Sequence, residues 1–230
     1  MRILFDNVVL SSSLSSLHQN PSYPLSNIKD DFLKRIYKST AATDSITIAF
    51  PAVQSVDCCY IGLTNSVTAT LYLYNSGGLL VSTKTIDTET SGGCFARVDF
   101  VSYAIITLAG TENIYVGNVG IGLTYKMPNP NNNIIKSHVD NSTTYSSDDG
   151  QYSINKIAWL KKVELSFFVL GMDLYNEIYA LFSLIQTPVW VDIYEELNNG
   201  INPTYSQLQF EEDAQTMRKY TFKCTMTEAR

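Results

Sequence analysis

The sequence has few ionisable side chains. Only two of its 230 residues are histidines, His18 and His138, and 17% of residues are charged, against about 25% in an ordinary domain. Both histidines lie in loop-like sequence. A Ser-His-Asp triad would have to use Ser137, His138 and Asp140, which are close neighbours in the chain, whereas triads are assembled by the fold from distant segments. We therefore expect no catalytic residues and a protein that is not an enzyme.

Cysteine is also scarce, and its spacing does not match the common metal sites. The four cysteines are Cys58, Cys59, Cys94 and Cys224, and no Cys-x-x-Cys pair occurs. Cys58 and Cys59 are adjacent in a strand-like run, so their side chains should face opposite ways. We expect reduced, mostly buried thiols, with no metal and no cofactor. The oxygen-rich segment DNSTTYSSDDG at 140–150 is the alternative, because such loops coordinate Ca²⁺, but it lacks EF-hand spacing.

Carboxylate pairs are the next candidates for chemistry, since two carboxylates carry out glycoside hydrolysis. Adjacent carboxylates in loops are more typical of a solvated surface. The segment GNVGIG, residues 117–122, has its glycines in the wrong pattern for a dinucleotide site. No binding, cofactor or metal residue is assigned. The carboxylate runs are Asp30-Asp31, Asp148-Asp149, Glu195-Glu196 and Glu211-Glu212-Asp213.

Long apolar runs and basic stripes are missing. No stretch approaches the roughly 20 apolar residues of a membrane helix. The net charge is −6 and no Lys/Arg stripe provides the electrostatic footprint of nucleic-acid binding. Residues 1–7, MRILFDN, do not resemble a signal peptide. We expect neither a nucleic-acid nor a membrane partner, and a soluble protein that stays in a cytoplasm at least at first.

Short alternating segments dominate the chain from Ser45 to Pro128. They are separated by the turn signals TNS, NSGG, TSGG and GTEN, a spacing that indicates an antiparallel sandwich. Pro51 separates the first two segments, so we predict separate strands there. The predicted strands are SITIAF at 45–50, SVDCCYIGLT at 55–64, VTATLYLY at 67–74, LLVSTKTI at 79–86, FARVDF at 95–100, YAIITLA at 103–109 and IYVGNVGIGLTYKMP at 114–128.

The remaining sequence predicts a second, smaller domain. PNPNNN at 128–133 cannot form a ladder or a helix interior, so we predict a polar linker over 128–150. In the region that follows, KKVELSFFV at 161–169, PVWVDIY at 188–194 and RKYTFKCTMTEA at 218–229 alternate as strands. Leu174, Ile178, Leu181, Phe182 and Ile185 follow helical spacing, with Asp173 as N-cap and Pro188 ending the helix.

The predicted fold is therefore mainly β. An N-terminal antiparallel, jelly-roll-like β-sandwich at 1–127 precedes the linker, and a small α+β domain at 151–230 consists of an antiparallel sheet with one helix.

Tyrosine is abundant, with 15 residues. Most aromatic rings of a sandwich pack in its core or on a sheet face. Rings at a sandwich tip can also stack on sugars, so a carbohydrate site at the loop tips is the alternative. The tyrosines predicted in the sandwich region are Tyr23, Tyr37, Tyr60, Tyr72, Tyr74, Tyr103, Tyr115 and Tyr125.

Three segments in order resemble a family of tailed-bacteriophage virion proteins. The first is ILFDN at 3–7 with NPSYPLSNIKDDFLKRIYKST at 20–40, the second is VDCCYIGLTN followed by ATLYLYNSGG, and the third is NIYVGNVGIGLTYKMP, which ends in aromatic-x-Met-Pro. Ile28 and Tyr37 stand where the family more often has Leu and Trp. The matching lead-in residues are Tyr23, Pro24, Ser26, Asn27, Ser39 and Thr40.

The resemblance implies a discoidin-like, galactose-binding-type sandwich whose lead-in wraps the sheets. It also implies a non-enzymatic structural protein of the virion tail, collar or tail-fibre attachment, assembled in the host cytoplasm. Its partners would be other tail or fibre proteins, with several copies in a symmetric assembly. The alternative is a carbohydrate-binding module that recognises a host-surface glycan, which would leave loop tips free with Tyr or Asn side chains converging there.

Overall fold

The chain forms two compact units in the computed structural model. Unit 1 contains Met1–Met127 and Val189–Tyr205, and unit 2 contains Pro128–Pro188 and Ser206–Ala229. The structure describes residues 1–30, 34–89, 91–128, 135–140, 143–146, 152–155, 159–184, 188–192, 204–215 and 219–229.

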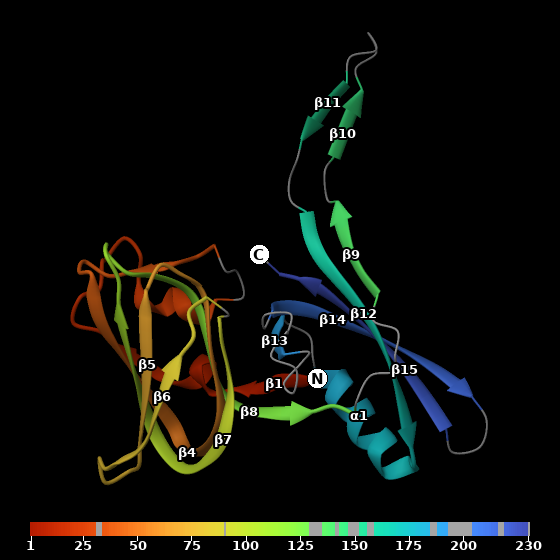
Figure 1. The fold of residues 1–230 in the computed structure, drawn as a ribbon, viewed down its shortest axis with the longest axis horizontal. Coiled ribbons are helices and arrows are strands. Elements are labelled where there is room, and N and C mark those ends of the chain that lie inside the picture. Colours follow the sequence, from red (N-terminus) through yellow and green to blue (C-terminus); the bar gives the residue numbers. More distant parts are fainter. Residues whose placement is uncertain are drawn as a thin grey trace. The chain divides into compact units, whose positions relative to one another are not determined.

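Unit 1 is a two-layered antiparallel sandwich (Figure 1). Its sheet order is β6-β5-β7-β4-β8-β1-β13, with β2 paired to β4 and β3 paired to β8. The elements are β1 Arg2–Asn7, the 3₁₀ helix η1 Val8–Ser11, β2 Ser13–Ser15, η2 Leu25–Lys29, β3 Tyr37–Lys38, β4 Thr43–Thr64, β5 Thr68–Tyr74, β6 Leu80–Ile86, β7 Gly92–Ala109, β8 Tyr115–Lys126 and β13 Val189–Asp192.

Two long strands pass through both layers. β4 has 22 residues and β7 has 18. The first part of β4 pairs with the end of β7, and its second part pairs with the start of β7 and with β8. The register shifts between Ala49 and Gln54, where the exposed Pro51 lies. The two strands predicted around Pro51 are thus one bent strand, because proline is tolerated where a ladder is interrupted.

The apolar residues of both layers meet in one core. Ile46 and Ile48 from the first half of β4 pack in the same cluster as Cys59 and Ile61 from its second half. The alternation predicted from the sequence is confirmed here, and the fold class is mainly β as predicted.

The lead-in covers the core as the resemblance implied. Leu25, Ile28 and Tyr37 are buried in the core cluster. The Asn27 side chain donates to the carbonyl of Ile36 at 2.9 Å, and this hydrogen bond joins η2 to the residue that precedes β3. The amide of Asp30 donates to the carbonyl of Asn27, so these residues supply turns. Residues 31–33 lie outside the described residues.

In the described residues, unit 2 is an antiparallel sheet in the order β14-β15-β12-β9, with the helix α1 and a separate two-stranded sheet of β10 and β11. Leu165, Phe167, Phe222 and Cys224 form a buried row, which confirms the predicted alternation on β12 and β15. The elements are β9 Ile135–Asp140, β10 Thr143–Ser146, β11 Tyr152–Asn155, β12 Trp159–Leu170, α1 Met172–Leu184, β14 Thr204–Gln215 and β15 Lys219–Glu228.

The second half of the chain differs from the sequence prediction in three respects. The predicted linker at 128–150 contains β9 and β10, because 135–140 pairs with β12 and 143–146 pairs with β11. The predicted strand at 188–194 includes β13, which belongs to unit 1 because it pairs with β1. Asp173 lies in the first turn of α1, since the carbonyl of Gly171 already accepts from the amide of Tyr175. Most of PNPNNN lies outside the described residues.

Among the described residues, no helix has the length and apolar character needed to cross a membrane.

Close packing on β8 makes glycine substitutions there costly. A Cβ at Gly122 would lie 2.1 Å from the Asp6 carbonyl oxygen, whereas a Cβ at Gly93 on β7 would meet nothing within 4 Å. We expect Gly122→Ala to lower the free energy of unfolding by about 1–3 kcal/mol, measured by urea titration. Gly93→Ala is the matched control, and equal effects of the two substitutions would contradict this packing.

Candidate functional site

Among the described residues, the ionisable side chains singled out in the sequence do not converge. His18 is exposed in a bend, as predicted. Ser137, His138 and Asp140 lie on strand β9 rather than in a loop, because this segment pairs with β12. The side chains of His138 and Asp140 lie outside the described residues.

The described members of the carboxylate runs do not come together either. Asp30 forms an ion pair with Arg35 at 2.9 Å, a surface contact. Glu211 is exposed on strand β14, so the Glu211-Glu212-Asp213 run is in a strand and not a loop. Asp31, Asp148-Asp149 and Glu195-Glu196 lie outside the described residues, as do the side chains of Glu212 and Asp213. Within the described part of the chain, no three His, Cys, Asp or Glu side chains form a group that could hold a metal ion.

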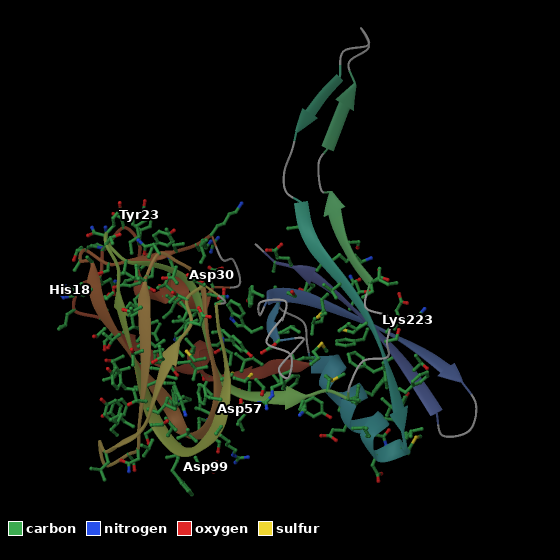
Figure 2. All side chains as sticks on the ribbon, viewed as in Figure 1. His18, Tyr23, Asp30, Asp57, Asp99 and Lys223 are labelled. Atoms are coloured by element: carbon green, nitrogen blue, oxygen red, sulfur yellow. The ribbon has the colours of Figure 1, made fainter. Side chains whose placement is uncertain are left out.

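A polar, tyrosine-bearing depression of about 720 Å³ lies in unit 1, at the end where β8 begins and β4 ends. Figure 2 shows Tyr23 at this end of the sandwich and Asp99 at the opposite end. The chain's lead-in, the loop after β4 and the loop before β8 all contribute to its wall. The depression is lined by Asn20, Tyr23, Lys38, Ser39, Asn65, Glu112, Asn113 and Tyr115.

One asparagine holds one wall of this depression. The Asn65 side chain donates to the carbonyl of Asn113 at 3.0 Å and accepts from the amide of Tyr115 at 2.8 Å. It thereby ties the loop after β4 to the start of β8. Because both ends of the amide are used, Asn65 positions Glu112 and Tyr115 rather than offering a free recognition group.

The lead-in forms the other wall through backbone contacts. The amide of Asn20 donates to the carbonyl of Lys38, and the amide of Lys38 donates to the carbonyl of Tyr23. The amide of Ser39 donates to the carbonyl of Ile114. The Lys38 ammonium lies 4.3 Å from the centre of the Tyr23 ring, a cation–π contact. One ring of the depression is therefore paired with a charge inside it.

Buried hydrogen bonds support the wall from behind. Tyr37, the neighbour of Lys38 on β3, is fully buried and its hydroxyl donates to the Asp44 carboxylate. Ser16 donates to both Asp44 oxygens at 2.8 and 2.9 Å. Burial first, and then the bond to Asp44, raise the pKa of Tyr37 to about 12, because both disfavour a phenolate. This network joins the lead-in to β4.

The groups left available in the depression suit hydroxyl-rich ligands. Glu112 and Asn113 are exposed, while Lys38 and Tyr115 are half-buried. No hydrogen bond or ion pair joins the Glu112 carboxylate to another described residue. The site thus combines an anionic acceptor, a cationic donor, amides and tyrosine rings within one concave surface.

Four of the other sandwich tyrosines are buried or stacked on another ring. Tyr37 and Tyr60 are fully buried, and Tyr74 stacks on Tyr103 with ring centres 4.7 Å apart. Only Tyr23 and Tyr115 line the depression. A smaller hollow of about 260 Å³ is lined by Leu17, His18, Thr43, Asp44, Ser45 and Thr107. The one carboxylate that lines this hollow, Asp44, already accepts hydrogen bonds from Ser16 and Tyr37. The hollow therefore offers fewer unpaired polar groups to a ligand.

Comparisons with protein-family models and with curated proteins found no match. Among solved structures, the chain is similar to a Clostridium perfringens module described as CpGH89CBM32-4 (16% identity, 52% of this chain and 100% of the other, TM-score 0.41). It is also similar to a chitosan-binding module from Paenibacillus sp. IK-5 (13% identity, 50% of this chain and 98% of the other, TM-score 0.42). A third similar structure is a fucose-binding module of Streptococcus pneumoniae (13% identity, 53% of this chain and 99% of the other, TM-score 0.40).

The buried tyrosine gives stability a pH dependence. Because the pKa of Tyr37 is about 12 in the folded protein and about 10 in an unfolded chain, its contribution is complete below pH 10 and is lost as the pH rises from 10 to 12. We expect Tyr37→Phe to make the unfolding free energy fall less steeply over this range, as measured by urea titration at several pH values. An unchanged slope would contradict the assignment.

Proposed function

We propose that the depression at the β4–β8 end of unit 1 binds a carbohydrate. The observation that carries the proposal is the convergence of Tyr23, Tyr115 and three asparagines with Lys38 and Glu112 on one concave surface. This is the arrangement of Tyr and Asn side chains that the sequence predicts for a carbohydrate-binding module. The function stated there as the alternative is therefore the one that the geometry favours.

The chemistry of the lining matches the chemistry of a sugar. Sugar hydroxyls both donate and accept hydrogen bonds, so they are served by a wall that offers a carboxylate, an ammonium and amides together. Tyr115 provides a ring face for the apolar C–H side of a pyranose, whereas the Tyr23 ring is already in contact with Lys38. A volume of about 720 Å³ falls within the range of small-molecule sites.

The frame behind the site is suited to binding without large rearrangement. The Asn65 side chain holds one wall through hydrogen bonds to backbone groups, and β3 with the buried Tyr37–Asp44 pair holds the other. A preorganised site loses less conformational entropy when the ligand binds. We therefore assign direct contact to Tyr115, Glu112, Asn113 and Lys38, and positioning to Asn65.

The structural role in a phage tail, collar or fibre attachment stays a prediction from the resemblance of the lead-in and the closing strand, as do its virion location and its protein partners. Glycan binding is compatible with that role if the virion protein recognises the host surface. Electron micrographs of particles lacking the protein would test it: missing fibres or tail parts would support the prediction, and intact particles would contradict it.

The carbohydrate proposal predicts specific loss of binding on substitution in the depression. We expect the full chain to bind defined members of a glycan array, with titration calorimetry giving the affinity of the best ligand. Glu112→Gln should weaken that affinity about 10- to 100-fold, the effect of removing a charged hydrogen-bond acceptor. Tyr115→Ala should weaken it, while Tyr115→Phe, which keeps the ring, should retain most of it.

The matched control for Glu112→Gln is Glu211→Gln, the same change of charge at an exposed side chain on β14 of unit 2, which should leave the affinity unchanged. If the wild-type chain bound no glycan, the proposal would be wrong. If it bound one and tolerated the substitutions at both 112 and 115, the site would lie elsewhere.

A further inference from the structure

Two of the four free thiols face each other across a pair of strands. Cys58 on β4 and Cys94 on β7 are direct partners in the antiparallel register, and both are free. Direct cross-strand partners have Cα atoms about 4.5–5.5 Å apart, which lies inside the window of about 4.4–6.8 Å that a disulfide requires. The backbone therefore already places these residues at bonding separation.

The side chains of this pair share one face of the sheet. The Cys94 sulfur lies 3.0 Å from the Tyr60 hydroxyl, and Tyr60 is on the same face of β4 as Cys58 because alternate strand residues face the same way. The Cys58 thiol donates a hydrogen bond to the carbonyl of Gly122, with sulfur and oxygen 3.5 Å apart. Cys59 faces the opposite side, in the apolar core cluster, and its strand partner is Gly93.

The two thiols differ in accessibility in a way that suits stepwise oxidation. Cys94 is half-buried, whereas Cys58 is fully buried. Cys94 is the third residue of β7 and follows Gly92 and Gly93, and a Cβ at Gly93 would meet nothing within 4 Å. At Gly92 this strand start is already packed closely against β4, because a Cβ there would lie 2.2 Å from the carbonyl oxygen of Cys59. Burial raises the pKa of Cys94 to about 11, so the exchange is slow at neutral pH.

We propose that Cys58 and Cys94 form a disulfide when the folded chain meets an oxidised small disulfide such as oxidised glutathione. The Cys94 thiolate attacks one sulfur of glutathione disulfide, forming a mixed disulfide and releasing one glutathione thiol. Cys58 then attacks the Cys94 sulfur, forming the Cys58–Cys94 bond and releasing the second glutathione thiol. Two protein thiols are oxidised and one small disulfide is reduced.

This bond would be a covalent cross-link between the two strands that pass through both layers. It would be absent in a reducing compartment and would form where the surroundings are oxidising. It would replace the contacts of Cys94 with Tyr60 and of Cys58 with Gly122. By constraining the unfolded chain, it should raise the melting temperature of the protein by roughly 5–15 °C.

The test is incubation of the full chain with oxidised glutathione, followed by peptide mass mapping without reduction. We expect a cross-link between the peptide that contains Cys58 and Cys59 and the peptide that contains Cys94, with fragment ions placing the bond on Cys58. Cys58→Ala should abolish the cross-link and leave Cys94 carrying glutathione. Cys59→Ala is the matched control, an equally buried neighbour, and should retain it.

Three results would overturn the proposal. They are mixed glutathione adducts in the wild type with no cross-link, a bond placed on Cys59, and a cross-link only between two chains. Because the mapping on the wild type is decisive by itself, the conclusion does not depend on whether the Cys58→Ala chain folds.

Discussion

The structure of unit 1 depends on one constraint, which is that β4 and β7 run through both layers of the sandwich. A strand has side chains that alternate between two faces, so each of these strands must keep its apolar set directed inward on both sides of the bend. The pairing register of β4 and β7 changes between Ala49 and Gln54, and this irregularity allows the strand to bend. Pro51 lies exposed at the same place. Ile46 and Ile61, one from each half of β4, reach the same core although they are an odd number of residues apart, because the register shifts between them change which alternate residues face inward.

The candidate site is a consequence of where these strands end. β4 ends at Thr64 and β8 begins at Tyr115, so Asn65 comes within hydrogen-bonding distance of Asn113 and Tyr115. The lead-in completes the concave surface because Tyr37 is anchored on Asp44 beneath it. Buried polar groups are costly unless they are hydrogen-bonded, and this pair is satisfied by Ser16 as well. The rigid frame and the exposed recognition groups are therefore adjacent parts of one arrangement.

The same strand pairing places Cys58 opposite Cys94 and forms the depression at the loop end, and the two proposed sites share no residue. A cross-link between Cys58 and Cys94 would strengthen the frame without using any residue that lines the depression. Unit 2 has its own sheet and helix, with a buried row that includes Phe167 and Phe222. Every residue that lines the depression is polar or hydroxyl-bearing, in contrast with this apolar packing, and this is why we propose the depression as a recognition surface.

The sequence by itself determined the mainly β fold, most strands of the sandwich and the helix near Ile178, because periodicity is a local property that burial enforces. It also indicated that Tyr23 or Tyr115 could meet a ligand, without separating them from the buried Tyr37 and Tyr60. Only the tertiary structure decided that β13 joins unit 1, that the segment after Met127 contains strands, and that Asn20, Asn65 and Glu112 meet. These features depend on pairing between residues far apart in the chain, and alternation along a strand carries no information about which strand will be its neighbour.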